Sequence, residues 1–445
     1  MLNNTIRFFL KNKPVAILNQ NKMNKIKTLL LLIIFLLFGG VISAQEAVSL
    51  PALIEKAIEV NPKIKSLQAK LNVARENIPI GTNLPDPVFS VGLLNVPVNT
   101  FSFRQEAMTG TALNLTQTIP FPGSLKAKAE VKAMDTLIVK QEIADLNNQI
   151  AQQMSTLYFS LQEKRREIEL AKESVDLLKQ VSLVVKRKFE VGSASLENIV
   201  QVEVQITRVK DKIEALKGDA QSKQAQMNAY LLRNDSVIIA TPEIVPISHE
   251  VFVTDTLLKL AALNRPVLKG IKLYQDKAVL QQKEVEKNYY PDLKVGLQYT
   301  FRSYNQATGM NYPDFLGLVV GITIPIGYGG NIKAQVNKTR YLQDYYGQQF
   351  HSSLQILQQS FGSIIAKINE LRSRENLLAK TMLPQTIQDY QAAIADYQVN
   401  KIDFVNVIKA EDDILKIKTE LAKLRTNYAI QIAQLEYLTG SKLTY

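Results

Sequence analysis

The chain has 445 residues, of which 46% are apolar but only 7% aromatic, and it contains no tryptophan and no cysteine. This composition excludes a disulfide-stabilised fold and thiol chemistry, and it is lean in the side chains that usually fill a globular core. Six of the twelve net positive charges fall in the first 44 residues. The remainder is only weakly basic, without the stripe of cations and aromatics that favours nucleic acid.

The first 44 residues have the pattern of an export signal. Lys25 and Lys27 precede an unbroken apolar run over residues 29–38, and small residues follow it. The run is shorter than the roughly 20 residues that a spanning helix needs. We therefore expect 1–44 to be an N-terminal extension and a cleaved signal peptide, with a retained anchor as the alternative. The sequence offers two candidate translation starts, Met1 and Met23.

Two pairs of strands are predicted, within about 86–121 and 291–326. Apolar and polar residues alternate over 112–119 and 291–302, which is the period of a strand with one apolar face. No segment after residue 45 is apolar enough for a spanning helix, so membrane insertion would require strands in a closed barrel. Because the smallest membrane barrels have about eight strands, several copies would have to pool theirs. A half-buried soluble sheet is the alternative.

Long helices are predicted by apolar residues that step by three and four. From Ser124 to Val191 no proline or internal glycine interrupts the pattern, which corresponds to a helix of about 100 Å. The apolar positions from 199 to 216 recur one for one at 407–424. Sustained heptads of this kind indicate helices that pack at shallow angles as a coiled coil.

The sequence after residue 44 is therefore a duplication of one helix and strand unit. We expect a first structural repeat at 45–232 with a helix, strands at about 86–121, a long helix at 124–191, a tip turn and a helix at 197–232. A connector or equatorial segment follows at 233–255. The second repeat, 256–445, has a helix, strands at about 291–326, a long helix at about 331–397, a tip turn and a helix at 403–438.

In this order the pieces resemble the TolC-type outer-membrane efflux protein family, over roughly residues 48–441. The resemblance is carried by the Asn-Pro and Arg-Pro helix starts at 61–62 and 265–266, and by the strand exits TIPFPGS (118–124) and TIPIGYGG (323–330). The first strand exit and the basic residues after it are most similar to the heavy-metal efflux branch. One departure is Asn400, which stands where the family's turn usually has glycine.

The resemblance implies a fold class that is mainly α with a membrane β-barrel portion. Long coiled-coil hairpins, four strands per chain and two internal repeats would build a trimeric barrel and a periplasmic tunnel. The implied location is the outer membrane, with a periplasmic extension. The implied function is a passive duct that exports small molecules or metal ions. Its implied partners are two further copies of the chain, outer-membrane lipid, a periplasmic adaptor protein and an inner-membrane pump.

No enzyme activity, catalytic residue, cofactor or metal site is expected. The only histidines, His249 and His351, are far apart and have no carboxylate at ligand spacing. The glycines after the second strand pair lack the Gly-Lys-Ser/Thr of a phosphate loop. Two other functions remain open, a periplasmic adaptor and the outer-membrane component of a protein secretion system. The exported substrate and the particular pump and adaptor are not specified by the sequence.

The two tip turns are the first candidate site. A hairpin tip has no core to pack into, so its side chains are free to contact another protein, and the resemblance implies that this protein is the adaptor. Six tips per trimer would match a six-membered adaptor ring, whereas ordinary turns are the simpler interpretation. The candidate docking residues are Val191, Gly192, Ser193, Val399, Asn400 and Lys401.

Three further residues precede the second tip. Asp389 and Asp396 are seven positions apart and share one helix face, so threefold symmetry would turn each into a ring of carboxylates that binds cations in a pore. The alternative is an ordinary solvated face. Pro384 removes a helical hydrogen bond, and we expect a kink there, where the tunnel would narrow; a tolerated surface proline is the alternative. The first repeat has Asp176 at the corresponding offset, so only one hairpin should kink.

Overall fold

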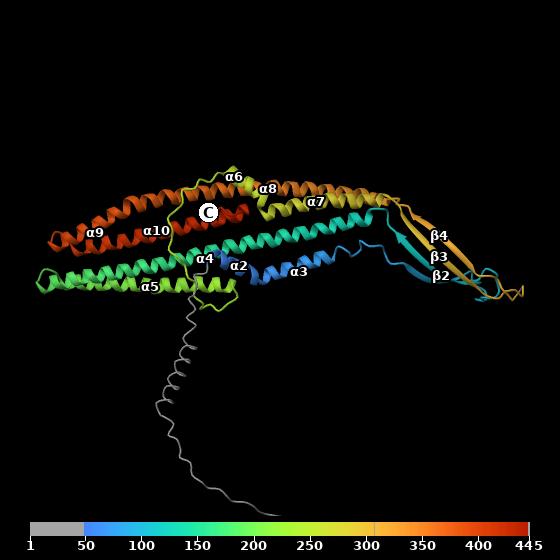
Figure 1. The fold of residues 1–445 in the computed structure, drawn as a ribbon, viewed down its shortest axis with the longest axis horizontal. Helices are drawn as coiled ribbons and strands as arrows, with labels where there is room; N and C mark the ends of the chain where they lie inside the picture. Colours follow the sequence, from blue (N-terminus) through green and yellow to red (C-terminus); the bar gives the residue numbers. More distant parts are fainter. Residues whose placement is uncertain (1–48, 307, 444–445) are drawn as a thin grey trace, which may run out of the picture. The chain divides into compact units, whose positions relative to one another are not determined.

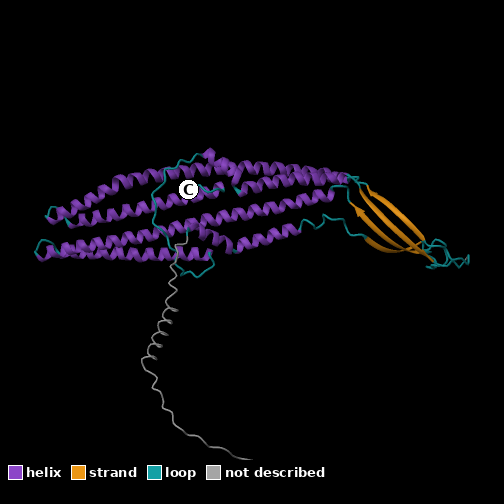
Figure 2. Cartoon of the chain, in the orientation of Figure 1, coloured by secondary structure: helices purple, strands orange, loops and turns teal. Residues whose placement is uncertain are grey.

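The structure of the chain, a computed structural model, describes residues 49–306 and 308–443. The extension and signal peptide expected at 1–44 lie outside the described residues. Within residues 49–443, long helices run side by side and a four-stranded sheet follows at one end of them (Figures 1 and 2). Among the described residues, no helix combines the length and apolarity needed to cross a bilayer.

The first repeat begins with two short helices joined at Asn61-Pro62. The Asn61 Oδ1 accepts a hydrogen bond from the Lys63 N–H at 2.8 Å, which caps the second helix. Pro62 occupies a first-turn position whose N–H would have no helical partner. The elements of this repeat are α2 (Leu50–Val60), α3 (Pro62–Glu76), β1 (Val88–Leu94), β2 (Gly110–Ile119), α4 (Ser124–Glu190) and α5 (Leu196–Tyr230).

The second repeat has the same order of elements, which confirms the predicted duplication of the fold. Its long helix is divided by a π-helical turn, whereas α4 is a single helix of 67 residues. Short 3-10 turns flank its strands at η1 (Lys287–Tyr289) and η2 (Tyr328–Gly330). The other elements are α6 (Thr254–Asn264), α7 (Pro266–Glu286), β3 (Asp292–Arg302), β4 (Phe315–Thr323), α8 (Asn331–Leu377), the π turn η3 (Leu378–Met382), α9 (Leu383–Gln398) and α10 (Phe404–Thr439).

The four strands form one antiparallel sheet in the order β1-β2-β3-β4, so the strand pairs of the two repeats meet at β2 and β3. The register places Phe89 opposite Leu115, Leu115 opposite Leu297, and Leu297 opposite Leu318. Because side chains alternate along a strand, this row and its neighbours two residues away share one face. The alternation predicted from the sequence is confirmed.

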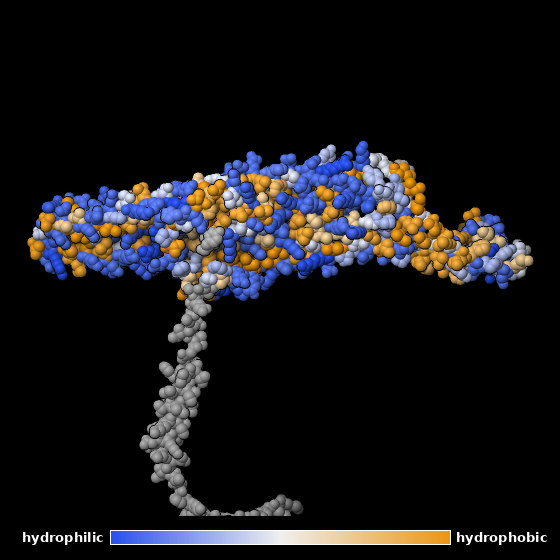
Figure 3. Space-filling model, turned by 45° about the horizontal axis from the view of Figure 1, so that its top comes forward, coloured by the Kyte–Doolittle hydropathy of each residue, from blue (hydrophilic) through white to orange (hydrophobic). Residues whose placement is uncertain are grey.

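The apolar face of the sheet is exposed. Phe89 is 62% and Leu318 is 71% accessible, and the space-filling view shows apolar residues over the strands (Figure 3). No helix among the described residues packs on the sheet at more than a few positions, so the alternative of a half-buried soluble sheet is wrong for the single chain. A continuous exposed apolar surface of this kind indicates a non-aqueous neighbour.

The helices bury the predicted apolar seams. Val202, Ile206, Val209, Ile213 and Leu216 of α5 are buried, as are their equivalents between Ala410 and Leu424 of α10. One apolar cluster joins α4, α5, α9 and α10, a second joins α6, α7, α8 and α10, and a third joins α2, α4 and α5. The core is therefore a series of small clusters along the helices, which accounts for the low aromatic content.

A segment that we call the strap, residues 232–253, connects the repeats and is fixed to the helices by its backbone. Gln162 Nε2 donates to the carbonyls of Pro242 and Glu243 at 2.8 and 2.9 Å. Arg165 donates to the Ile239 carbonyl and to Thr241, and Arg372 donates to the carbonyls of Ser248 and Glu250. The strap lacks helix and strand, so these side chains satisfy backbone groups that secondary structure would otherwise pair.

Candidate functional site

The two tip turns have the same backbone geometry. Gly192 has φ +73° and Asn400 has φ +62°, the left-handed conformation that ends a helix. The residue after each donates its N–H to a carbonyl five positions back, from Ser193 to Lys188 at 2.7 Å and from Lys401 to Asp396 at 2.9 Å. Asparagine tolerates this conformation at some cost, so its presence at position 400 leaves the turn intact.

The tip side chains are exposed. Val191 is 74% and Val399 is 62% accessible, and the side chain of Lys401 at the second tip is largely exposed. A Cβ on Gly192 would meet no atom within 4 Å, so steric crowding does not require glycine there. The positive φ of this residue is what favours glycine. The six candidate docking residues thus lie at two similar ends, and their role in docking stays a prediction.

Lys188, which the sequence did not single out, links the two tips. Its ammonium donates to the Asn400 Oδ1 at 2.5 Å and to the Gln398 carbonyl at 3.2 Å, and it also binds the Tyr397 carbonyl. It lies 4.4 Å from the centroid of the Tyr397 ring. A cation at these carbonyls stabilises the end of α9, so the end of one hairpin is capped by a side chain of the other.

The two candidate pore acids differ in their surroundings. Asp396 forms an ion pair with Lys401 across the tip, at 3.7 Å. Asp389 is exposed and has no basic partner in the described part of the chain. The single chain therefore leaves Asp389 as the freer carboxylate. Whether either forms a ring in a pore stays a prediction.

Pro384 follows directly after the π-helical turn. It is the second residue of α9, which begins at Leu383 where η3 ends. A proline has no N–H and its ring clashes with the carbonyl four residues earlier, here that of Lys380, and one wider turn relieves this clash. The irregularity occurs only in the second repeat, because α4 runs past Asp176 without a break. The narrowing of a tunnel at this point stays a prediction.

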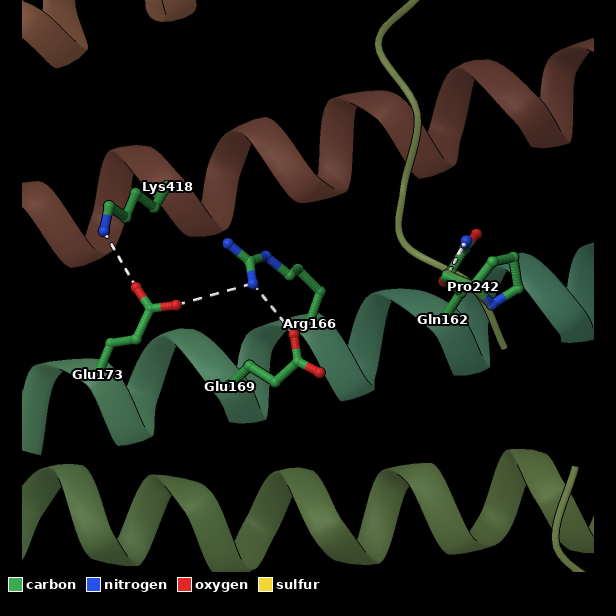
Figure 4. A network of polar contacts seen from close by, with 6 residues as sticks. All are labelled: Gln162, Arg166, Glu169, Glu173, Pro242 and Lys418. Carbon is green, nitrogen blue, oxygen red and sulfur yellow. Dashed lines mark hydrogen bonds and ion pairs between the residues drawn. The ribbon is translucent and has the colours of Figure 1, made fainter. Parts of the chain in front are cut away.

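Charged side chains connect α4 and α10 beside the strap (Figure 4). Glu173 of α4 lies between Lys418 of α10 and Arg166, at 3.1 and 3.7 Å, and Arg166 also contacts Glu169 at 3.0 Å. These groups are partly exposed, so each pair contributes little to stability. Of these pairs only Lys418–Glu173 joins helices of the two repeats, since the other two lie within α4.

A buried carboxyl lies between the same helices. Glu411 of α10 is 2% accessible, its Oε1 accepts a hydrogen bond from the Ser174 hydroxyl of α4, and its Oε2 has no partner. Burial raises the pKa of Glu411 to about 7. Burial and the nearby Glu411 raise the pKa of Tyr390 of α9 to about 12. No sequence pattern indicated this group, because Glu411 occupies a surface position in its own heptad.

No group of three or more His, Cys, Asp or Glu side chains that could hold a metal ion occurs in the described part of the chain. Two separated surfaces stand out, the exposed apolar sheet face and the paired tips, and long helices join them. This combination defines the class of outer-membrane channel proteins with a helical periplasmic extension.

The chain belongs to the outer membrane efflux protein family, whose model matches residues 53–231 and 257–441. The two matched segments correspond to the two repeats. Outer membrane protein TolC of Escherichia coli strain K12 is 26% identical over 45% of the chain. That match spans 44% of the relative's own length. Family members are outer-membrane efflux channels rather than enzymes.

Solved structures of outer-membrane channels share the fold. The outer membrane protein VceC of Vibrio cholerae superimposes with a TM-score of 0.70 at 15% identity, covering 89% of this chain and 97% of VceC. CusC gives 0.70 at 16%, covering 88% and 92%, and CmeC of Campylobacter jejuni gives 0.66 at 15%, covering 88% and 85%. Because different channels match equally well, the heavy-metal branch stays a prediction.

Proposed function

We propose that the chain is one subunit of a passive export duct in the outer membrane, built from three copies. The observation that carries the proposal is that the exposed apolar sheet face and the two tips lie at opposite ends of the long helices (Figure 1). Lipid would cover the apolar face. The helices would then extend about 100 Å into the periplasm.

Assembly follows from the sheet edges. The outer edges of β1 and β4 have no strand partner within residues 49–443. Unpaired N–H and C=O groups in hydrocarbon cost several kcal/mol each, so β1 of one copy would pair with β4 of the next. Family resemblance favours three copies, which would supply twelve strands.

The tips would dock a periplasmic adaptor, and an inner-membrane pump would supply energy. Three chains with two similar tips each would present six contact points. The cargo is proposed as small molecules or metal ions that enter from the periplasm or the pump. An adaptor role is not favoured, because the chain has two hairpins and a four-stranded sheet with an exposed apolar face.

The test combines fractionation, mass and transport. The full chain should sediment with outer membranes, need detergent for extraction, and give a trimer by native mass spectrometry. Planar bilayers that contain the trimer should show ion-conducting channels. A stable detergent-extracted monomer, or a trimer that does not conduct under any voltage, would contradict the duct.

A further inference from the structure

A cleft lies beneath the strap, midway along the helices. It has a volume of about 390 Å³ and is bounded by the strap on one side and by α4 and α10 on the other. Clefts of 300–1,000 Å³ accommodate small organic molecules. We call it the equatorial cleft.

The equatorial cleft is preformed. The strap crosses α10 and is fastened to α4 at Pro242 by Gln162 (Figure 4). Arg165 and Arg372 hold it on either side of that point. A ligand would therefore enter an existing space and would not have to order a loop, which removes part of the entropic cost of binding.

Its walls are apolar and aromatic. Tyr158 and Phe159 of α4 and Tyr428 of α10 line it, with Val245 and Pro246 of the strap opposite. Tyr158 and Phe159 are in edge contact at a centroid distance of 5.8 Å. Ring faces of this kind bind flat apolar bodies and attract cations.

The polar groups of the cleft favour a cation. Glu243 and Glu250 line it from the strap, and neither forms an ion pair within the described residues. The one basic lining residue, Arg425, donates from both Nε and Nη2 to Glu375 at 3.0 and 2.9 Å, so its charge is balanced. Acids therefore outnumber bases among the residues that line the cleft, while Arg165 and Arg372 bind the backbone of the strap beside it.

One buried hydroxyl in the cleft has no partner. Thr426 lines the cleft, is 1% accessible, and its Oγ1 makes no hydrogen bond. An unpaired buried hydroxyl costs free energy that a ligand group can recover. A ligand N–H donor would satisfy this oxygen.

We propose that the equatorial cleft binds a lipophilic organic cation that carries an N–H group. The aromatic walls take its apolar body, Glu243 and Glu250 its charge, and Thr426 its N–H. The site goes beyond the proposed duct and does not depend on it, because one chain supplies every lining group.

The experiment measures ethidium binding to the full chain in lipid nanodiscs by fluorescence anisotropy, with empty nanodiscs as background. Ethidium is a flat cation with amino groups. Saturable binding is expected to weaken roughly tenfold when Glu243→Gln and Glu250→Gln are combined. Asp219→Asn, an exposed acid of α5 outside the cleft, is the charge control and should bind normally.

A second pair of variants tests whether ethidium binds in the equatorial cleft. Ala429 lines the cleft, so Ala429→Phe should fill it and abolish saturable binding, whereas Ala392→Phe, on the exposed face of α9, should not.

Wild-type affinity in both the double Gln variant and Ala429→Phe would overturn the inference, as would failure of the wild type to bind ethidium. Equal binding of anionic 8-anilinonaphthalene-1-sulfonate with the same residue dependence would overturn the cation assignment. Absent dye binding with normal channel conductance would contradict this site and leave the duct unaffected.

Discussion

Lys188 of the first repeat donates a hydrogen bond to the Asn400 Oδ1 of the second repeat, at 2.5 Å. The same ammonium caps the carbonyls that end α9 and stacks on Tyr397. The two tips are therefore one structural unit in the single chain. The end of the second hairpin depends on a residue of the first.

We expect Lys188→Met to loosen the second tip. The variant removes the charged donor to three acceptors, and a hydrogen bond to a charged group contributes about 1.5–3 kcal/mol. Hydrogen exchange at residues 397–402 should accelerate, while exchange along α4 should not change. Lys179→Met is the matched control, since Lys179 is an exposed lysine of the same helix whose partner is Asp176. Equal exchange in both variants would show that the link carries no stability.

The sequence predicts the repeating elements but not the contacts that join the repeats. Alternation in the strands and heptads in the helices are local patterns, so the strands, the buried seams and the duplication could be read directly. Lys188 and Asn400 are 212 positions apart, and Ser174 and Glu411 are 237 apart. Neither pair has a periodic signal. The sequence also does not predict the π turn before Pro384, because a proline indicates strain but not the way in which the backbone relieves it.

The buried Glu411 predicts that stability depends on pH. Its pKa is about 7 in the folded chain and 4.5 as the ordinary value, so folding favours the protonated form. The contribution of Glu411 to the free energy of unfolding is complete below about pH 4.5 and is lost as the pH rises through 7. The total loss is about 3 kcal/mol at most. The groups that face it are Ser174 on α4, Tyr390 on α9, and Asp412 and Lys418 on α10.

Thermal unfolding followed by circular dichroism at pH 5.5 and pH 8.5 tests the pH dependence of stability predicted from Glu411. The wild type should lose thermal stability at the higher pH, and Glu411→Gln should lose less, because the neutral amide keeps a partner for Ser174 without a charge. Glu173→Gln is the control, since Glu173 is half-exposed and paired. A pH dependence that persists unchanged in Glu411→Gln would assign it to other groups.

Pro384 should set the position of the π turn. Pro384→Ala restores an N–H and removes the ring clash, so residues 378–382 are expected to return to regular α-helix and the axis of α8 and α9 to straighten. A structure of the variant, together with single-channel conductance, measures both effects. The reciprocal variant Asp176→Pro should break the uninterrupted α4 and cost about 3 kcal/mol. An unchanged helix axis with unchanged conductance in Pro384→Ala would rule out a role in the tunnel.

The acids before the second tip predict a difference between two similar substitutions. If threefold symmetry forms rings of carboxylates in the pore, Asp389→Asn should relieve block by divalent cations more than Asp396→Asn, because Asp396 is already paired with Lys401. Conductance of planar bilayers with and without millimolar Mg²⁺ gives the comparison. Conductance that is insensitive to divalent cations in the wild type and in the double variant would identify an ordinary solvated face.

The tips predict a variant that loses export without losing assembly. Gly192 has φ +73°, and a Cβ added to it would lie in open space, so Gly192→Val should strain only the local backbone, by about 1–3 kcal/mol. Gly218→Val is the matched control, because Gly218 also has open space but no left-handed conformation. Val191→Asp places a charge on the exposed tip without altering its turn.

Export by living cells and the yield of outer-membrane trimer should be measured together in these variants. The sheet lies about 100 Å from the tips along α4, so trimer yield is expected to stay normal in all three. Lost export in Gly192→Val and Val191→Asp, with normal export in Gly218→Val, would support docking at the tips. Normal export in both tip variants would contradict docking at the tips. Reduced trimer yield in either variant would indicate instead that the tips are needed for folding or assembly.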